Sequence, residues 1–382
     1  MSDTRFYRGQ GHREPKTADA LPTVDLETMR RPEDYRATPE LAAAVDVALT
    51  LGMPLLLTGE PGSGKSGLAD SLAWELGLGE PLRFPVKSDT ESRDLFYRFD
   101  TVGRFHAAQA RPADGGDEDR ADAGRFIAFE ALGQAILHAK PPAIEQELRL
   151  PPGSLAHPGA PRRSVVLIDE IDKAPRDVPN DILVEIERMA FGIPELSGSG
   201  RALVQVALTP EEARWRPIVI FTSNSEKALP DPFLRRCVYH HLGFPPFDAD
   251  LKPDAQGNLP EDRVTVDTIV AARLGSRFQR KQQAEANVAD ALDLFRTLRG
   301  EGLGLTRRPT LAELLDWLDH LMPQRLPPSA WTQLAALRAG GDADTEQRLL
   351  TAITSLLLKR PADKARAPTL LAQWRQTRNA RQ

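Results

Sequence analysis

The sequence predicts an α/β fold built on a parallel sheet, with a smaller all-helical region after it. Short apolar runs that suit buried parallel strands alternate with stretches of helical spacing as far as residue 242. After Pro245-Pro246 only helical patterns follow. The expected strands lie at 54–58, 82–87, 165–168, 218–222 and 238–242.

Helical spacing and turn residues indicate where the domains begin and end. Thr38 suits the N-cap of a first helix, Pro39 its first position, and Gly52 its end. We expect a long irregular stretch at 88–163, with an exposed acidic loop at 114–122. The predicted organisation is a flexible N-terminal arm at 1–37, an α/β domain at 38–247, a helical domain at 262–360 and a basic tail at 361–382.

The composition is that of an ordinary globular protein and argues against several classes of function. The chain has 382 residues, 41% of them hydrophobic, and a formal net charge of −5, which does not favour a general nucleic-acid or anionic-membrane binder. No apolar run approaches the roughly 20 residues that span a bilayer, and Met1–Pro22 lacks the apolar centre of a signal peptide. A single cysteine, Cys237, excludes an internal disulfide, and no histidines have metal-ligand spacing. We therefore expect a cytoplasmic protein.

A Gly-rich segment between an expected strand and an expected helix matches the pattern G-x-x-x-x-G-K-[ST]. Its residues are Gly59, Glu60, Pro61, Gly62, Ser63, Gly64, Lys65 and Ser66. Glycines let successive backbone N–H groups turn towards phosphate oxygens, and the helix start adds its positive end. Lys65 would contact the β- and γ-phosphates, and the Ser66 hydroxyl would bind Mg²⁺. A plain Gly-rich turn before a helix is the alternative.

Two carboxylates end the expected strand at 165–168. Asp169 and Glu170 would reach the carboxyl edge of the sheet, where open α/β sheets bind ligands. Asp169 would hold the Mg²⁺ that Ser66 also binds, and Glu170 would orient and polarise an attacking water. The alternative is a strand that leaves the core into a polar loop.

Polar residues also follow the expected strand at 218–222. Asn224 would hydrogen-bond the attacking water or the γ-phosphate, unless it only terminates the strand. Arg235 and Arg236 follow and suit a developing phosphoryl charge, in cis or in trans. The alternative for the two arginines is a solvated helix end.

This order of motifs resembles that of AAA+ ATPases, and its detail is similar to the MoxR branch and its dynein-related relatives. The resemblance runs over about residues 35–360. It rests on Pro54–Ser66, Ile168–Ala174, Pro179–Leu183, Thr222–Asn224 and Leu229–Arg236.

The resemblance implies a five-stranded sheet with helices on both faces, a helical lid and assembly as a hexameric ring, with ATP and Mg²⁺ between subunits. It gives Asn224 the place of sensor 1, and Arg235 or Arg236 that of a finger reaching a neighbour's ATP. Sensor 2 falls at Arg307 or Arg308, and we prefer Arg308. The family pattern has Pro before Arg, whereas here Pro309 comes after.

The same resemblance places Tyr97, Phe99 and Phe105 in a stretch that carries an insert facing the ring pore, with ordinary packing as the alternative. We expect ATP rather than GTP because no N-K-x-D guanine motif follows the strands.

Three functions are open at this level. The first is a chaperone-like ATPase that remodels partner proteins, often ones with von Willebrand factor A domains, as MoxR-type proteins are thought to do. The second is a subunit of a nucleic-acid-processing or defence complex, which the basic tail favours and the overall acidity disfavours. The third, a scaffold without hydrolysis, is disfavoured by the presence of Lys65, Asp169 and Glu170. The sequence does not name the partner or substrate.

Overall fold

A computed structural model describes most of the chain, in two compact units. The described residues are 31–109, 123–197, 202–225, 227–253, 256–275, 281–300, 303–321 and 343–379. The first unit, the sheet unit, comprises Ala37–Glu60 and Lys65–Gly243. The second, the helical unit, runs from Phe244 onward and includes Pro61–Gly64 and the segment before Ala37. The acidic loop predicted at 114–122 and most of the predicted arm lie outside the described residues.

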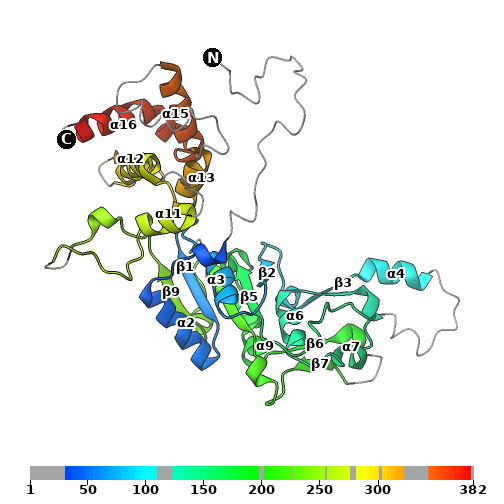
Figure 1. Cartoon of the computed structure of the whole chain (residues 1–382). Coiled ribbons are helices and arrows are strands. Elements are labelled where there is room, and N and C mark those ends of the chain that lie inside the picture. The colour runs from blue at the N-terminus through cyan, green and yellow to red at the C-terminus, as the bar shows by residue number, and fades with distance from the viewer. Residues whose placement is uncertain are drawn as a thin grey trace. The chain divides into compact units, whose positions relative to one another are not determined.

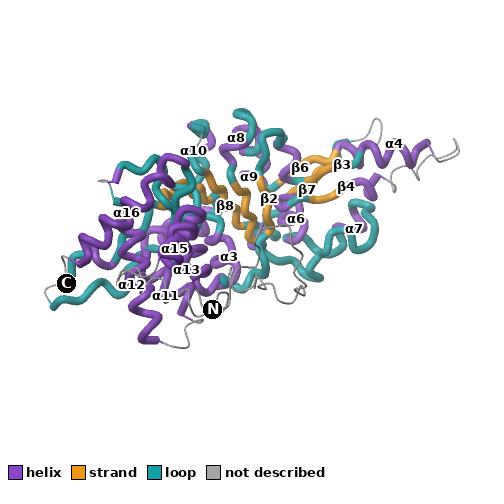
Figure 2. The backbone as a smooth tube through the Cα atoms, turned by 90° about the horizontal axis from the view of Figure 1, so that it is seen from above, coloured by secondary structure: helices purple, strands orange, loops and turns teal. Residues whose placement is uncertain are grey.

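A five-stranded parallel sheet forms the centre of the sheet unit (Figures 1 and 2), in the order β2-β5-β8-β1-β9. The predicted α/β fold with five parallel strands is confirmed. Its strands are β1 (Leu55–Gly59), β2 (Leu82–Pro85), β5 (Val165–Asp169), β8 (Ile218–Ser223) and β9 (Val238–Leu242).

Both faces of this sheet are covered. Successive strand residues point to opposite faces, yet the residues of β1 are buried without alternation, and so are nearly all of those in β5 and β8. Helix α2 packs against β1 and β9, while α3 packs against β5, and α6 against β2 and β5. The continuous apolar runs of the sequence are therefore those of strands buried on both sides.

The helices of the sheet unit begin and end where local chemistry favours it. Thr38 caps α2, its Oγ1 accepting a hydrogen bond from Leu41 N at 3.2 Å, and Gly52 ends the helix in the left-handed conformation at φ 63°. The predicted start and end of this helix are confirmed. The helices are α2 (Pro39–Leu51), α3 (Gly67–Glu75), α4 (Thr101–Gln109), α6 (Ala131–His138), α7 (Ile144–Glu147), α8 (Val178–Asp181), α9 (Leu183–Arg188) and α10 (Asp231–Leu234).

The prediction of a long irregular stretch at 88–163 is wrong. It contains α4, α6 and α7, and an antiparallel ribbon of β3 (Tyr97–Phe99) and β4 (Ile127–Phe129). Figures 1 and 2 both show α4 at the far end of this ribbon. These elements are short, so they leave only weak periodic signals in the sequence.

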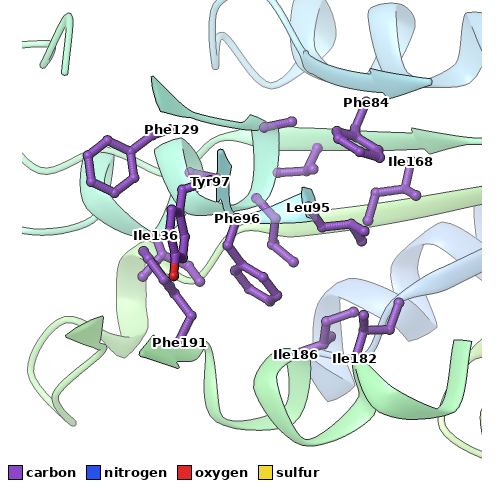
Figure 3. Close-up of a cluster of buried hydrophobic side chains, with 14 of the residues drawn as sticks. Phe84, Leu95, Phe96, Tyr97, Phe129, Ile136, Ile168, Ile182, Ile186 and Phe191 are labelled. Atoms are coloured by element: carbon purple, nitrogen blue, oxygen red, sulfur yellow. The ribbon is translucent and has the colours of Figure 1, made fainter. Parts of the chain in front are cut away.

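A second antiparallel ribbon, β6 (Ala190–Ile193) with β7 (Val204–Ala207), packs against the first. The rings of Phe96 and Phe191 stack at 5.2 Å between centroids, and Tyr97 and Phe129 lie around them (Figure 3). These aromatic contacts join the two ribbons to the main core.

The helical unit has its own apolar core, to which all of its long helices contribute. They are α11 (Val266–Gly275), α12 (Lys281–Arg299), α13 (Leu311–Leu321), α15 (Ala343–Leu356) and α16 (Pro361–Asn379). We expected a basic tail from residue 361, but α16 buries Leu370, Leu371 and Trp374 in this core. In the part of the chain that the structure describes, no helix is long and apolar enough to cross a membrane.

Candidate active site

The strand order brings three polar strand ends to one edge of the sheet. The Gly-rich loop follows β1, the carboxylates Asp169 and Glu170 end β5, and Thr222 lies near the end of β8. Because β8 lies between β1 and β5 in a parallel sheet, these ends meet at the carboxyl edge, where open α/β sheets bind ligands.

The loop Gly59–Ser66 has the backbone of a phosphate cradle. Gly59, Gly62 and Gly64 have φ values of 148°, 74° and 94°, which L-residues with side chains rarely adopt. A Cβ atom at Gly59 would lie 2.3 Å from the carbonyl oxygen of Leu242 on β9, so only glycine fits there. The Ser63 hydroxyl is buried without a hydrogen-bond partner among the described residues, as expected if a ligand anion accepts its bond.

Lys65 lies inside this loop and is only 6% exposed. Its Nζ donates to the carbonyl oxygens of Gly59 and Glu60, each at 2.9 Å. Burial lowers the pKa of Lys65, and the neighbouring carboxylates, Asp169 first among them, oppose that shift. Two of the three ammonium donors therefore hold the loop, and the positive charge faces the carboxylate side of the site.

Ser66 and Asp169 meet although they are 103 residues apart, as Ser66 Oγ donates to Asp169 Oδ1 at 2.9 Å. The sequence predicted that these two residues share one Mg²⁺, and the structure does place their oxygens side by side. A hydroxyl and a carboxylate are hard oxygen donors of the kind that Mg²⁺ takes, with water and phosphate completing its shell. The described residues contain no cluster of three or more His, Cys, Asp or Glu that could hold a metal ion.

Both carboxylate oxygens of Glu170 have partners. Asn224 Nδ2 donates to Oε1 at 3.0 Å, and Lys173 Nζ forms an ion pair with Oε2. Glu170 and Asn224 were each predicted to act on an attacking water, and the structure joins them by this hydrogen bond. Lys173 was not singled out from the sequence. It lies three residues on, at the end of the short 3₁₀ helix η5 (Ile171–Lys173), which Glu170 precedes.

A second residue that the sequence did not single out is Thr222. Its hydroxyl donates to Asp169 Oδ1 and accepts from the backbone N–H of Glu170 at 2.9 Å. The available signal was its position on β8, two residues before Asn224.

The two arginines that follow α10 are both exposed but differ in their contacts. Arg236 Nε pairs with Glu187 Oε1 at 2.6 Å, and its Nη1 donates to Pro232 O at 3.2 Å. Arg235 has no comparable contact among the described residues.

Arg307 and Arg308 lie in the helical unit, before α13. Arg307 Nη1 pairs with the buried Glu313 at 2.8 Å, whereas the side chain of Arg308 is exposed. Asp363 of α16 holds the backbone of this loop, accepting from the N–H groups of Thr306 at 2.9 Å and Arg307 at 3.3 Å. The sequence gave no sign of this support from the C-terminal helix.

The three aromatic residues considered for a pore-facing insert have different environments. Tyr97 is fully buried and its hydroxyl donates to Glu195 Oε2 at 2.7 Å, so packing accounts for it. Phe99 is partly buried beside the same core, and Phe105 on α4 is 60% exposed.

Comparison with known families agrees with this geometry. Residues 54–237 match the model of the AAA domain (dynein-related subfamily). Comparison with curated proteins gives no match. The matched residues contain the phosphate loop and the ends of β5 and β8. With its parallel α/β sheet and a helical region after it, the chain has a P-loop AAA+ fold, and the match supports an AAA+ ATPase.

Proposed function

We propose that this protein is a Mg²⁺-dependent ATPase that uses hydrolysis to remodel partner proteins, as MoxR-type AAA+ proteins are thought to do. The observation that carries the ATPase proposal is the bond from Ser66 Oγ to Asp169 Oδ1 at 2.9 Å, beside the buried Lys65. This bond joins the phosphate loop to the end of β5. A Mg²⁺ ion held by Ser66 and Asp169 would therefore lie next to phosphates bound in the loop.

In this proposal the phosphate loop binds the nucleotide. The backbone N–H groups of the loop and the start of α3 would hold phosphate oxygens, and Lys65 would add a charge-assisted bond. Ser66 and Asp169 would hold Mg²⁺, which when bound neutralises charge on the β- and γ-phosphates. The cost of burying Lys65 is offset by these anions and by the carboxylates around it.

Glu170 would position and polarise the attacking water, with Asn224 beside it as sensor 1. Each oxygen of Glu170 has one partner, Asn224 on Oε1 and Lys173 on Oε2, and each has a second lone pair that can still accept a hydrogen bond from a water.

Arg235 is proposed to act on the ATP of a neighbouring subunit in a ring, which we expect to be hexameric. Its exposed guanidinium has no contact among the described residues like the Glu187 pair that holds Arg236. Arg308, whose side chain is exposed before α13, is proposed as sensor 2 on the resemblance to AAA+ ATPases.

The test of the ATPase proposal is phosphate release from ATP by the purified chain, with and without Mg²⁺. We expect release that depends on Mg²⁺ and is absent in Lys65→Ala, which also loses ATP binding. Lys87→Ala changes an exposed lysine after β2 and is the matched control. Micromolar ATP binding retained by Lys65→Ala, or hydrolysis unaffected by a chelator, would contradict the site.

The remodelling proposal needs a partner, which we expect to be a protein, such as one with a von Willebrand factor A domain. Glu170→Gln should bind ATP without hydrolysing it and so hold complexes together. Purification of this variant from native extract with ATP, beside Lys65→Ala as the control, should enrich a protein that the control lacks. Enrichment of nucleic acid instead would favour a role in a nucleic-acid-processing complex.

A further inference from the structure

The side chain of Thr222 connects the two carboxylate residues of the site. It is fully buried near the end of β8. Its Oγ1 donates to Asp169 Oδ1 and accepts the backbone N–H of Glu170 at 2.9 Å. One hydroxyl therefore contacts the side chain of the first residue and the main chain of the second.

Only a hydroxyl can make both bonds at this place, because it offers one donor and two acceptor lone pairs on a single atom. On the carboxylate, Oδ1 of Asp169 accepts a second bond, from Ser66 Oγ at 2.9 Å. Two hydroxyls, one at the start of α3 and one near the end of β8, thus bind the same oxygen of this carboxylate and fix its rotation.

The second bond supports an unusual backbone conformation. Glu170 has φ 61° and ψ 51°, in the left-handed region that residues other than glycine rarely adopt. The direction of its side chain follows from these angles. Its N–H would lose its partner if the threonine hydroxyl were removed, and the conformation would lose that support.

We propose that Thr222 is a positioning residue that orients Asp169 and Glu170 together. This inference rests on the proposed roles of these two carboxylates in ATP hydrolysis. Among the described residues, the hydroxyl of Thr222 bonds only to Asp169 and Glu170. It acts through these two residues.

The test uses two substitutions that differ by one oxygen atom. Thr222→Ala removes the hydroxyl, and Thr222→Ser keeps it, while both lose the methyl group. We expect kcat to fall about 10- to 100-fold in Thr222→Ala, the scale for residues that orient metal ligands, and to return most of the way in Thr222→Ser. Binding of a fluorescent ATP analogue to the phosphate loop should change little, whereas the Mg²⁺ concentration for half-maximal activity should rise in Thr222→Ala.

Thr265 provides a matched control in the helical unit. It is also fully buried, and its hydroxyl also donates to a carboxylate, Asp248 Oδ1, at 2.6 Å and accepts a backbone N–H, that of Thr268, at 3.1 Å. Thr265→Ala should lower the Tm about as much as Thr222→Ala does but leave kcat near that of the wild type.

Three outcomes would overturn the proposal. The first is wild-type kcat in Thr222→Ala, and the second is an equal loss in Thr222→Ala and Thr222→Ser. The third is an equal loss in the Thr222 and Thr265 alanine variants, since lost stability alone would then explain it. If Thr222→Ala does not fold, Thr222→Val fills the space without the hydroxyl and takes its place. Glu170→Gln in the same assay distinguishes failure of the Thr222 proposal from failure of the proposed ATPase site. If Glu170→Gln hydrolyses ATP normally, the proposed site itself is wrong.

Discussion

Asn224 Nδ2 lies 3.0 Å from Glu170 Oε1, and this bond joins the polar ends of β8 and β5. The other oxygen of Glu170 pairs with Lys173. The carboxylate that would act on water is thus oriented by neighbouring side chains of the protein. A group oriented in advance has less reorganisation to undergo in the transition state.

Replacing Glu170 by Gln should separate binding from hydrolysis. The Gln amide oxygen can still accept from Asn224, so the geometry is kept, but the negative charge and the basic site are lost. We expect ATP hydrolysis to be at least ~10²-fold slower with binding retained, the usual scale for a positioned general base. Single-turnover kinetics measure the rate of hydrolysis, and equilibrium titration measures the affinity for ATP. The control is Glu80→Gln, at an exposed site before β2. Normal turnover by Glu170→Gln would remove this residue from the role.

Arg307 and Arg308 should respond differently to alanine. Arg307 and Lys359 share the carboxylate of Glu313, each at 2.8 Å. Arg307→Ala should therefore lower stability by about 1 kcal/mol, the net value of one such bond, which a thermal melt would detect. Arg308→Ala should lower ATP turnover more than Arg307→Ala does. The reverse pattern would assign sensor 2 to Arg307.

The sequence predicted those features that neighbouring residues along the chain determine. Strands such as β1 and β5 were predictable because burial on both faces leaves unbroken apolar runs. Lys65, Asp169 and Glu170 were identifiable because a motif or a strand end marks them.

Contacts that depend on the fold were not predictable. The bonds of Thr222 join residues 52 and 53 positions apart, so the strand order decides them. The ribbon β3–β4 has strands of only three residues each, too short to show a period. The basic residues of α16 led us to predict a tail, although the same segment contains Leu370, Leu371 and Trp374, which are buried in the core of the helical unit.

His138 should make the sheet unit sensitive to acid. Burial, the largest cause, lowers the pKa of this imidazole below its usual 6.5, a hydrogen bond with Leu155 O opposes the shift, and Arg162 and His157 add to it. The folded state therefore binds this proton at lower pH than the unfolded chain does. The stabilising contribution is complete above about pH 6.5 and is lost as the pH falls towards the lowered value.

Thermal melts between about pH 7.5 and about pH 5.5 measure this dependence. Replacement by glutamine should flatten the fall in Tm over this range, although lost packing lowers Tm at every pH. The control is His106→Gln, at an exposed position on α4, which should leave the slope as in the wild type. An unchanged slope in His138→Gln would show that other groups cause the acid sensitivity.

The arginines after α10 should differ in their effect on turnover. Arg236 is held by Glu187, whereas Arg235 is exposed and has no such contact among the described residues. Adjacent residues on a helical turn point about 100° apart, so only one of them can face a neighbouring subunit. We expect the larger loss of ATP turnover in Arg235→Ala, about 10³-fold if it acts as a finger, with ATP binding retained. Arg236→Ala should mainly weaken the link to α9.

Mixing variants decides whether the action is in trans. A subunit lacking both arginines, Arg235→Ala with Arg236→Ala, should be inactive alone but keep an intact phosphate loop. A Lys65→Ala subunit should be inactive for the opposite reason, since its arginines are intact but it binds no nucleotide. In a mixed ring, the loop of the first can meet the arginine of the second, so activity should return. Each variant mixed with itself is the control, and labelled subunits verify exchange.

No recovery in rings shown to be mixed would mean that the arginines act in cis or only support the fold. A chain that remains a 42.1 kDa monomer with and without nucleotide would exclude action in trans.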